Sequence, residues 1–128
     1  MSSASRDLGR RAEDLAATHL ASRGYRIVAR NARPGEVRGE LDVIAVEGRT
    51  LVFIEVKAGR VGAIAGPEKP AAAVGTRKRA KLRSLAVAWL RANEGRVPAY
   101  GQLRFDVIGI RLDDAGAVAE WEHLRGAF

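Results

Sequence analysis

The chain has 128 residues, 47% of them hydrophobic, which is enough for one hydrophobic core and too little for two, so we expect a single domain over residues 1–128. It contains no cysteine and two histidines, which excludes a disulfide framework and a zinc site built from thiolates or several imidazoles. The net charge of +7 favours a polyanionic partner such as nucleic acid.

The N-terminal stretch "MSSASRDLGRRAEDLA" is charged where a signal peptide would be apolar. No apolar run approaches the roughly 18 residues that a membrane-spanning helix needs. We therefore expect a soluble, cytoplasmic protein that has no membrane partner.

The first half of the chain predicts a helix followed by three strands. Apolar residues at helical spacing place the helix over about residues 5–22, and Gly24 supplies its stop. "YRIVAR" predicts a short strand, and the turn-rich "NARPGEVRG" a connection. "ELDVIAV" and "TLVFIEVK" predict two strands, and the short "EGR" between them indicates an antiparallel hairpin.

The second half predicts a helix and one or two strands after a long loop. Residues 58–75 are rich in glycine, alanine and proline, so we expect a mobile loop there. Thr76 is expected to cap a helix that ends by Gly95 and carries the apolar stripe Leu82, Leu85, Ala86 and Trp89. "LRFDVIGI" predicts a strand, "RLDDAGA" a turn and "VAEWEHL" a last strand. This order predicts an α/β or α+β fold with a mixed sheet.

The second hairpin strand changes character along one face. Because side chains alternate along a strand, one face carries Leu51, Phe53, Glu55 and Lys57. That face begins apolar and ends charged, whereas a strand facing solvent would be polar throughout. We therefore predict that the strand runs from the core into a cleft.

The hairpin also predicts which residues face each other. A loop of two or four residues gives the same register, in which Val46 faces Leu51 and Asp42 faces Glu55. Like charges at such cross-strand positions, about 5 Å apart, are destabilising, so the two carboxylates require a cation. Lys57 is near enough to supply positive charge to the two carboxylates, and the same register makes it face Glu40.

Carboxylate oxygens are the ligands that Mg²⁺ or Mn²⁺ prefers, so we predict a metal site at Asp42 and Glu55. Lys57 would orient or deprotonate an attacking water, or neutralise a phosphate. A structural interpretation stays open beside this one. In it, Asp42 caps a turn, Glu55 and Lys57 form a solvated strand end, and Lys57 makes a weak surface ion pair with Glu40.

These residues carry a resemblance to a known superfamily. "GELDVIAVEGRTLVFIEVK" resembles the core of the PD-(D/E)xK nucleases, with Asp42 as the first acid and Glu55 and Lys57 as the E-x-K element. The whole chain resembles the uncharacterised bacterial YraN-like family, which is similar to Holliday junction resolvases. The matching pieces are "GRRAEDLAATHLASRGYRIVARN", "RGELDVIA", "LVFIEVK", "TRKRAKLRSLA", "RFDVIGI" and "EHLRGAF".

The resemblance implies a restriction-endonuclease-like α/β core, a central mixed sheet flanked by helices, and metal-dependent cleavage of DNA. It implies that Asp42 and Glu55 hold magnesium, that the Val56 carbonyl adds a ligand and that Lys57 serves the water. It also implies that Glu13 of the first helix joins the site, the alternative being an ordinary charge beside the apolar stripe. After Lys57 the chain reads "AGRV" where this family commonly has "TRRS", which removes polar and basic groups beside the site.

Basic residues crowd the start of the second predicted helix, an end where the helix dipole disfavours them. Phosphate would compensate for this arrangement, because helix N-termini, lysine and arginine all bind phosphate. Beside the nuclease motif, we predict that DNA is the partner and that the contacts come from Arg77, Lys78, Arg79 and Lys81. A solvated basic face is the alternative.

Three further titratable residues are expected to be structural. Asp106 shares a strand face with Arg104, so a salt bridge to that or another basic residue is favoured over a site role. His19 lies in an apolar stripe and is predicted to be a core histidine. His123 is predicted to make structural hydrogen bonds.

The leading hypothesis from the sequence is a metal-dependent DNA endonuclease, with branched or otherwise structured DNA as the candidate substrate. A non-catalytic nucleic-acid-binding module with the nuclease fold is the alternative. A third hypothesis is a scaffold protein that uses residues 58–75 as a partner site. A homodimer would suit cleavage of two strands, although no residue demonstrates it.

Overall fold

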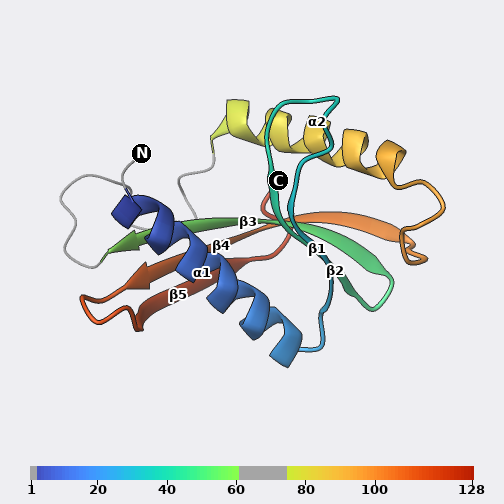
Figure 1. Ribbon diagram of the computed structural model, residues 1–128. Coiled ribbons are helices and arrows are strands. Elements are labelled where there is room, and N and C mark those ends of the chain that lie inside the picture. The colour runs from blue at the N-terminus through green and yellow to red at the C-terminus, as the bar shows by residue number, and fades with distance from the viewer. Residues whose placement is uncertain (1–2, 61–74) are drawn as a thin grey trace.

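The computed structural model describes residues 3–60 and 75–128. One mixed sheet has the strand order β1-β2-β3-β4-β5, in which β3 and β4 run parallel and the other neighbours antiparallel. Helices α1 and α2 lie on opposite sides of this sheet (Figure 1). The elements are α1 (Ser3–Ser22), β1 (Arg26–Ala32), β2 (Leu41–Glu47), β3 (Thr50–Arg60), α2 (Thr76–Ala92), β4 (Gln102–Leu112) and β5 (Val118–Leu124).

This arrangement is the α/β, restriction-endonuclease-like core that the sequence predicted. The predicted order of helix, three strands, helix and strands is confirmed, and the last strand has the predicted bounds. Among the described residues, neither helix is long and apolar enough to cross a membrane.

The sheet separates two hydrophobic clusters. Val52 and Ile54 of β3 belong to the cluster beneath α1, whereas Leu51 and Phe53 belong to the cluster beneath α2. Alternate residues of β3 therefore enter different cores, as the strand period requires. The α2 side of its cluster is formed by the predicted apolar stripe, Leu82, Leu85, Ala86 and Trp89.

A two-residue loop joins β2 to β3. It consists of Gly48 and Arg49, and Gly48 has φ +60°, a conformation that favours glycine in tight hairpins. The strands pair Val46 with Leu51 and continue to Val43 with Ile54. The predicted register is thus confirmed.

The ends of β3 and α2 differ from expectation. β3 continues to Arg60, because its last residues pair in parallel with β4 as far as Leu112. The start of the loop expected over residues 58–75 is therefore strand, and residues 61–74 lie outside the described residues. The cap expected at Thr76 is wrong, because Gly75 is the N-cap and no side chain caps the helix.

α1 ends in a glycine-dependent turn that places the next residue in the core. Gly24 has φ +89°, and its N–H donates to the Ala21 carbonyl at 3.2 Å. The N–H of Tyr25 donates to the Leu20 carbonyl at 3.0 Å, which completes a Schellman motif. Tyr25 is consequently buried under the end of α1.

Candidate metal centre

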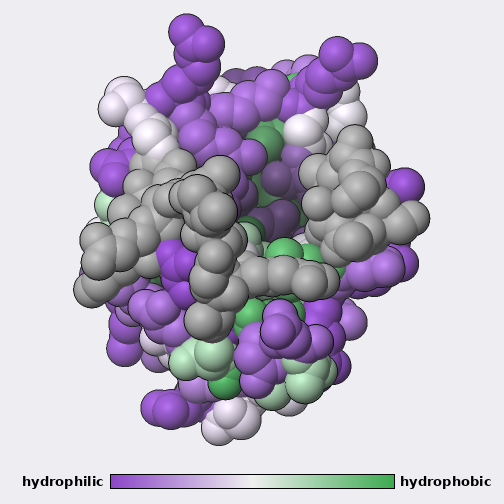
Figure 2. Space-filling view, turned by 90° about the vertical axis from the view of Figure 1, so that its left-hand side faces the viewer, coloured by the Kyte–Doolittle hydropathy of each residue, from purple (hydrophilic) through white to green (hydrophobic). Residues whose placement is uncertain are grey.

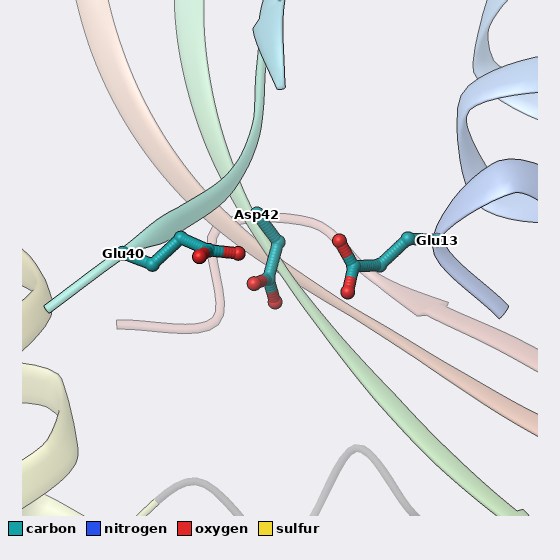
Figure 3. A group of neighbouring side chains, drawn as sticks. All are labelled: Glu13, Glu40 and Asp42. Atoms are coloured by element: carbon teal, nitrogen blue, oxygen red, sulfur yellow. The ribbon is translucent and has the colours of Figure 1, made fainter. Parts of the chain in front are cut away.

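Acidic side chains from α1 and β2 meet at one edge of the sheet. Glu13, Glu40 and Asp42 each offer a carboxylate oxygen, and these oxygens lie within 4.8 Å of one another. Figure 3 shows Glu13 reaching from α1 toward Asp42, with Glu40 on the other side. The alignment of these elements therefore supplies three oxygen ligands at one place.

Asp42 lies one residue beyond the last pair of the β2–β3 ladder, beside Glu55 and Val56. Its Oδ2 accepts a hydrogen bond from the Val56 N–H at 2.9 Å. Burial, the charge of Glu55 and a hydrogen bond with Glu55 raise the pKa of Asp42 to about 8, although the Val56 N–H opposes this shift. The two carboxyl groups are thus as close as the hairpin register predicted, and without a cation Asp42 keeps its proton near neutral pH.

Glu55 is 6% exposed and has two lysines beside it. Lys57 Nζ lies 3.5 Å and Lys78 Nζ 3.6 Å from Glu55 Oε1. The expected pairing of Lys57 with Glu40 is not formed, since Glu40 makes an ion pair with Arg33 at 2.7 Å. β2 begins after Glu40, so the hairpin register does not extend to that residue.

Glu13 is half-buried and faces the other carboxylates. Burial, followed by the charge of Glu40, raises the pKa of Glu13, whereas Arg30 opposes the shift. The structure therefore brings Glu13 to the place that the resemblance implied. Its part in catalysis stays a prediction.

Three residues of this site were not predicted from the sequence. Glu40 was assigned to an ion pair with Lys57, although its position two residues before Asp42 was a usable signal. Asn31 has φ +51°, and with its amide nitrogen toward the carboxylates it donates to Glu40 Oε1 at 2.7 Å and Glu13 Oε1 at 2.5 Å. Lys78 was predicted to contact nucleic acid, and its proximity to Glu55 depends on helix packing that no local pattern reveals.

The donor set fits a hard divalent cation. Oxygen ligands from Glu13, Glu40 and Asp42 lie close together, with Glu55 beside them, and the raised pKa of Asp42 shows that its negative charge is poorly compensated. Magnesium and manganese favour such oxygen sites, whereas zinc sites usually include nitrogen or sulfur. A ligand role for the Val56 carbonyl stays a prediction.

The predicted nucleic-acid-binding residues occupy the first turns of α2. Lys78 points to Glu55, and the Arg79 guanidinium lies 5.6 Å from the ring centre of Phe128. Arg77 and Lys81 are exposed. In Figure 2, which views the side where the N-terminal ends of both helices lie in Figure 1, hydrophilic residues lie above and within a hollow. The basic end of α2 and the acidic group thus lie near each other.

The three residues expected to be structural are away from this site. Asp106 is fully buried and forms the predicted salt bridge, accepting from Arg104 Nε at 2.8 Å. His123 makes the predicted structural bond through Nε2 to Asp106 Oδ2 at 2.8 Å. His19 is only half-buried and packs on Trp121 with ring centres 4.0 Å apart, so the expectation of a core histidine is only partly met.

Replacing Asp42 by asparagine is expected to stabilise the metal-free protein. The pKa of Asp42 is raised from 3.8 to about 8, so its stabilising contribution is complete below pH 4 and is lost as the pH rises through 8. Urea unfolding in chelator should show the variant to be more stable than the wild type by about 1 to 3 kcal/mol at pH 8. The gap should shrink at pH 5.

The effect of magnesium on the melting temperature is a second test of Asp42. Magnesium should raise the melting temperature of the wild type and leave Asp42→Asn unchanged, because mass action stabilises only a state that binds. The exposed Glu94→Gln is the control for loss of a carboxylate. In the urea experiment, equal stability of Asp42→Asn and the wild type at both pH values would contradict charge repulsion between Asp42 and Glu55.

Comparison with known proteins identifies the family. The model of the uncharacterised protein family UPF0102, the YraN-like family, matches residues 12–110. A UPF0102 protein of Parafrankia sp. (strain EAN1pec) is 48% identical over 97% of this chain and 98% of its own. UPF0102 proteins of Arthrobacter sp. (strain FB24) and Rhodococcus jostii (strain RHA1) are 46% and 45% identical, over 93% and 94% of this chain and 93% and 95% of their own. The chain therefore belongs to the UPF0102 family.

Proposed function

We propose that this protein is a metal-dependent DNA endonuclease that hydrolyses phosphodiester bonds, with branched or otherwise structured DNA as the candidate substrate. The observation that carries the proposal is the convergence of Glu13, Asp42 and Glu55 from three separate elements. Lys57 lies beside Glu55. Carboxylates with an adjacent lysine form a group that can hold a metal, a water and a phosphate together.

Each residue of the group has a defined task. Asp42 and Glu55 hold Mg²⁺ or Mn²⁺, Glu13 and Glu40 supply further oxygens, and the Val56 carbonyl is the remaining proposed ligand. When bound, the metal stabilises charge on the phosphodiester and lowers the pKa of the attacking water. Loss of the Asp42 proton accompanies its conversion to a ligand.

Lys57 orients the attacking water and neutralises charge on the phosphate, while the proton of the water passes to solvent. Its Nζ is 3.5 Å from Glu55 Oε1, so the ammonium is held at the metal ligand rather than in bulk solvent. The water oxygen forms a bond to phosphorus as the bond from phosphorus to the leaving oxygen breaks. The leaving oxygen takes a proton from solvent, and the phosphate stays on the other product.

The direct test of this function is cleavage of a panel of linear, nicked, flapped and four-way DNA substrates. We expect cleavage of at least one structured substrate with magnesium or manganese, and none in chelator. DNA binding without cleavage of any substrate, together with no heat of divalent-ion binding in calorimetry, would refute the enzymatic proposal. Binding alone would then support the second candidate.

Arg77→Gln is expected to weaken DNA binding about 3- to 10-fold and to reduce the slope of log affinity against log salt by about 1. The reason is that Arg77 is exposed in the first turn of α2, where its guanidinium can meet a phosphate. Fluorescence anisotropy at several salt concentrations measures both quantities. Arg91→Gln, the same change in the last turn of α2, is the control. Equal losses in the two variants would contradict a localised DNA contact.

The second candidate is a DNA-binding module without catalysis. It is favoured by the two lysines at Glu55, because Lys57 and Lys78 already supply positive charge to that carboxylate. This module would bind DNA equally well in magnesium and in chelator. If the protein is an endonuclease, we instead expect magnesium to strengthen the binding of uncleavable DNA, since Asp42 and Glu55 would hold the cation and it would supply positive charge for a phosphate.

A further inference from the structure

A second cavity lies at the C-terminal end of α1, apart from the metal centre. Its volume is about 450 Å³, and its lining includes Arg23, Tyr25, Trp121, His123 and Arg125. None of the proposed metal ligands lines it. The size is within the range of small-molecule sites, about 300 to 1,000 Å³.

A buried carboxylate, that of Asp106, holds one of the residues that line this cavity, His123. Asp106 is 0% exposed and accepts hydrogen bonds from Arg104 Nη2, His123 Nε2 and the Gly126 N–H at 2.9, 2.8 and 2.9 Å. Burial would raise the pKa of Asp106, but these bonds outweigh it and hold the pKa at about 2. The carboxylate is therefore ionised and holds Arg104 and His123 in place.

Arg104 connects Asp106 to two residues that line the cavity. Its Nη2 donates to the Tyr25 hydroxyl at 2.9 Å, and its Nη1 donates to Glu47 Oε1 at 3.0 Å. Arg125 also contacts Glu47. A buried ion-pair network seldom stabilises a fold more than apolar packing would, so its value lies in holding polar groups in a fixed geometry. Here those groups line a cavity.

The cavity combines aromatic rings with guanidinium groups. His19 and Trp121 pack with ring centres 4.0 Å apart, and Tyr25 and His123 with ring centres 6.2 Å apart. The Arg23 side chain is exposed at the rim of the cavity and forms no hydrogen bond or ion pair with the other described residues. Glu47 is already neutralised by Arg104 and Arg125.

We propose that this cavity binds a nucleotide, with the phosphate held by Arg23 and Arg125 and the base against Trp121. Guanidinium groups bind phosphate oxygens, and aromatic rings stack on bases without requiring a sequence. The nucleotide is either free or the terminal residue of a DNA strand. The site does not depend on the metal centre, so its test is run in chelator.

Isothermal titration calorimetry with a deoxynucleoside monophosphate is the first test. We expect saturable binding with a Kd on the order of 10 to 100 µM. Inorganic phosphate alone and the deoxynucleoside alone should each bind at least tenfold more weakly. Arg23→Gln should lose at least tenfold in affinity, whereas the exposed Arg96→Gln should match the wild type. No saturable binding, or equal binding by both variants, would overturn the proposal.

Tryptophan fluorescence tests the position of the base. The chain has two tryptophans, and the Trp89→Phe variant leaves Trp121 as the reporter. The nucleotide should change the emission of that variant with the Kd found by calorimetry. An unchanged emission at saturating nucleotide would refute stacking against Trp121.

DNA ends distinguish the two sources of the nucleotide. If the site holds a strand end, a duplex with 5′-phosphates should bind more tightly than the same duplex with 5′-hydroxyls, and Arg23→Gln should remove the difference. Equal binding of the two duplexes together with mononucleotide binding would identify the free nucleotide as the ligand.

Discussion

Glu55→Gln is expected to lower the rate of DNA cleavage by at least about 1,000-fold without changing the fold. Glutamine keeps the size of the side chain but removes the negative charge that attracts Lys57 and Lys78 and that we propose as a metal ligand. The rate is measured under single turnover with manganese and the best substrate of the panel. Circular dichroism checks that the variant is folded.

Glu120→Gln is the matched control for this loss. Glu120 is an exposed carboxylate on β5 that forms an ion pair with Arg111, so the same change there removes a charge away from the metal centre. Its cleavage rate should stay within about twofold of the wild type. Retention of wild-type activity within tenfold by Glu55→Gln would show that the proposed ligand is not needed for catalysis.

Asp106→Ala is expected to destabilise the protein by about 3 to 5 kcal/mol, because removing this buried carboxylate takes the hydrogen-bond partner from Arg104 and His123. Asp106 is fully buried and accepts four hydrogen bonds, two of them from Arg104. Urea unfolding at pH 7 measures the change. The exposed Asp114→Ala should fall within about 0.5 kcal/mol of the wild type. A loss below about 1 kcal/mol at Asp106 would contradict the structural role of the network.

The Asp106 carboxylate also makes the stability of the protein fall at low pH. Its pKa is lowered from 3.8 to about 2, so its stabilising contribution is present above pH 4 and is lost as the pH falls through 2. That contribution is about 2 kcal/mol for a shift of this size. The Asp106→Ala variant should therefore lose less stability than the wild type between pH 4 and pH 2.

The sequence was sufficient for the hairpin and its register. Loops of two and of four residues give the same pairing, so the placement of Val46 opposite Leu51, and of Asp42 beside Glu55, follows from local rules for any even loop length, whereas an odd length would have moved Asp42 to the other face. The apolar stripe of α2 was also predictable because helix period and burial agree. Thr76 was misassigned, since a glycine before it offered an N-cap that competes with a hydroxyl.

The remaining features depend on how separate elements pack. The approach of Lys78 to Glu55 requires the position of α2 over the sheet, and the meeting of Glu13 with Glu40 requires that of α1. No local sequence pattern predicts either contact. The cavity at the end of α1 likewise joins Arg23 to Trp121 on the last strand.

Soaking crystals in manganese tests whether Asp42 and Glu55 bind a metal, because the anomalous scattering of manganese locates the ion without reference to activity. We expect an anomalous peak between the carboxylates of Asp42 and Glu55, with Glu13 or Glu40 within ligand distance. The peak should be lost in crystals of Glu55→Gln. No peak at these carboxylates in wild-type crystals soaked in millimolar manganese would contradict the metal centre and the hydrolytic function built on it.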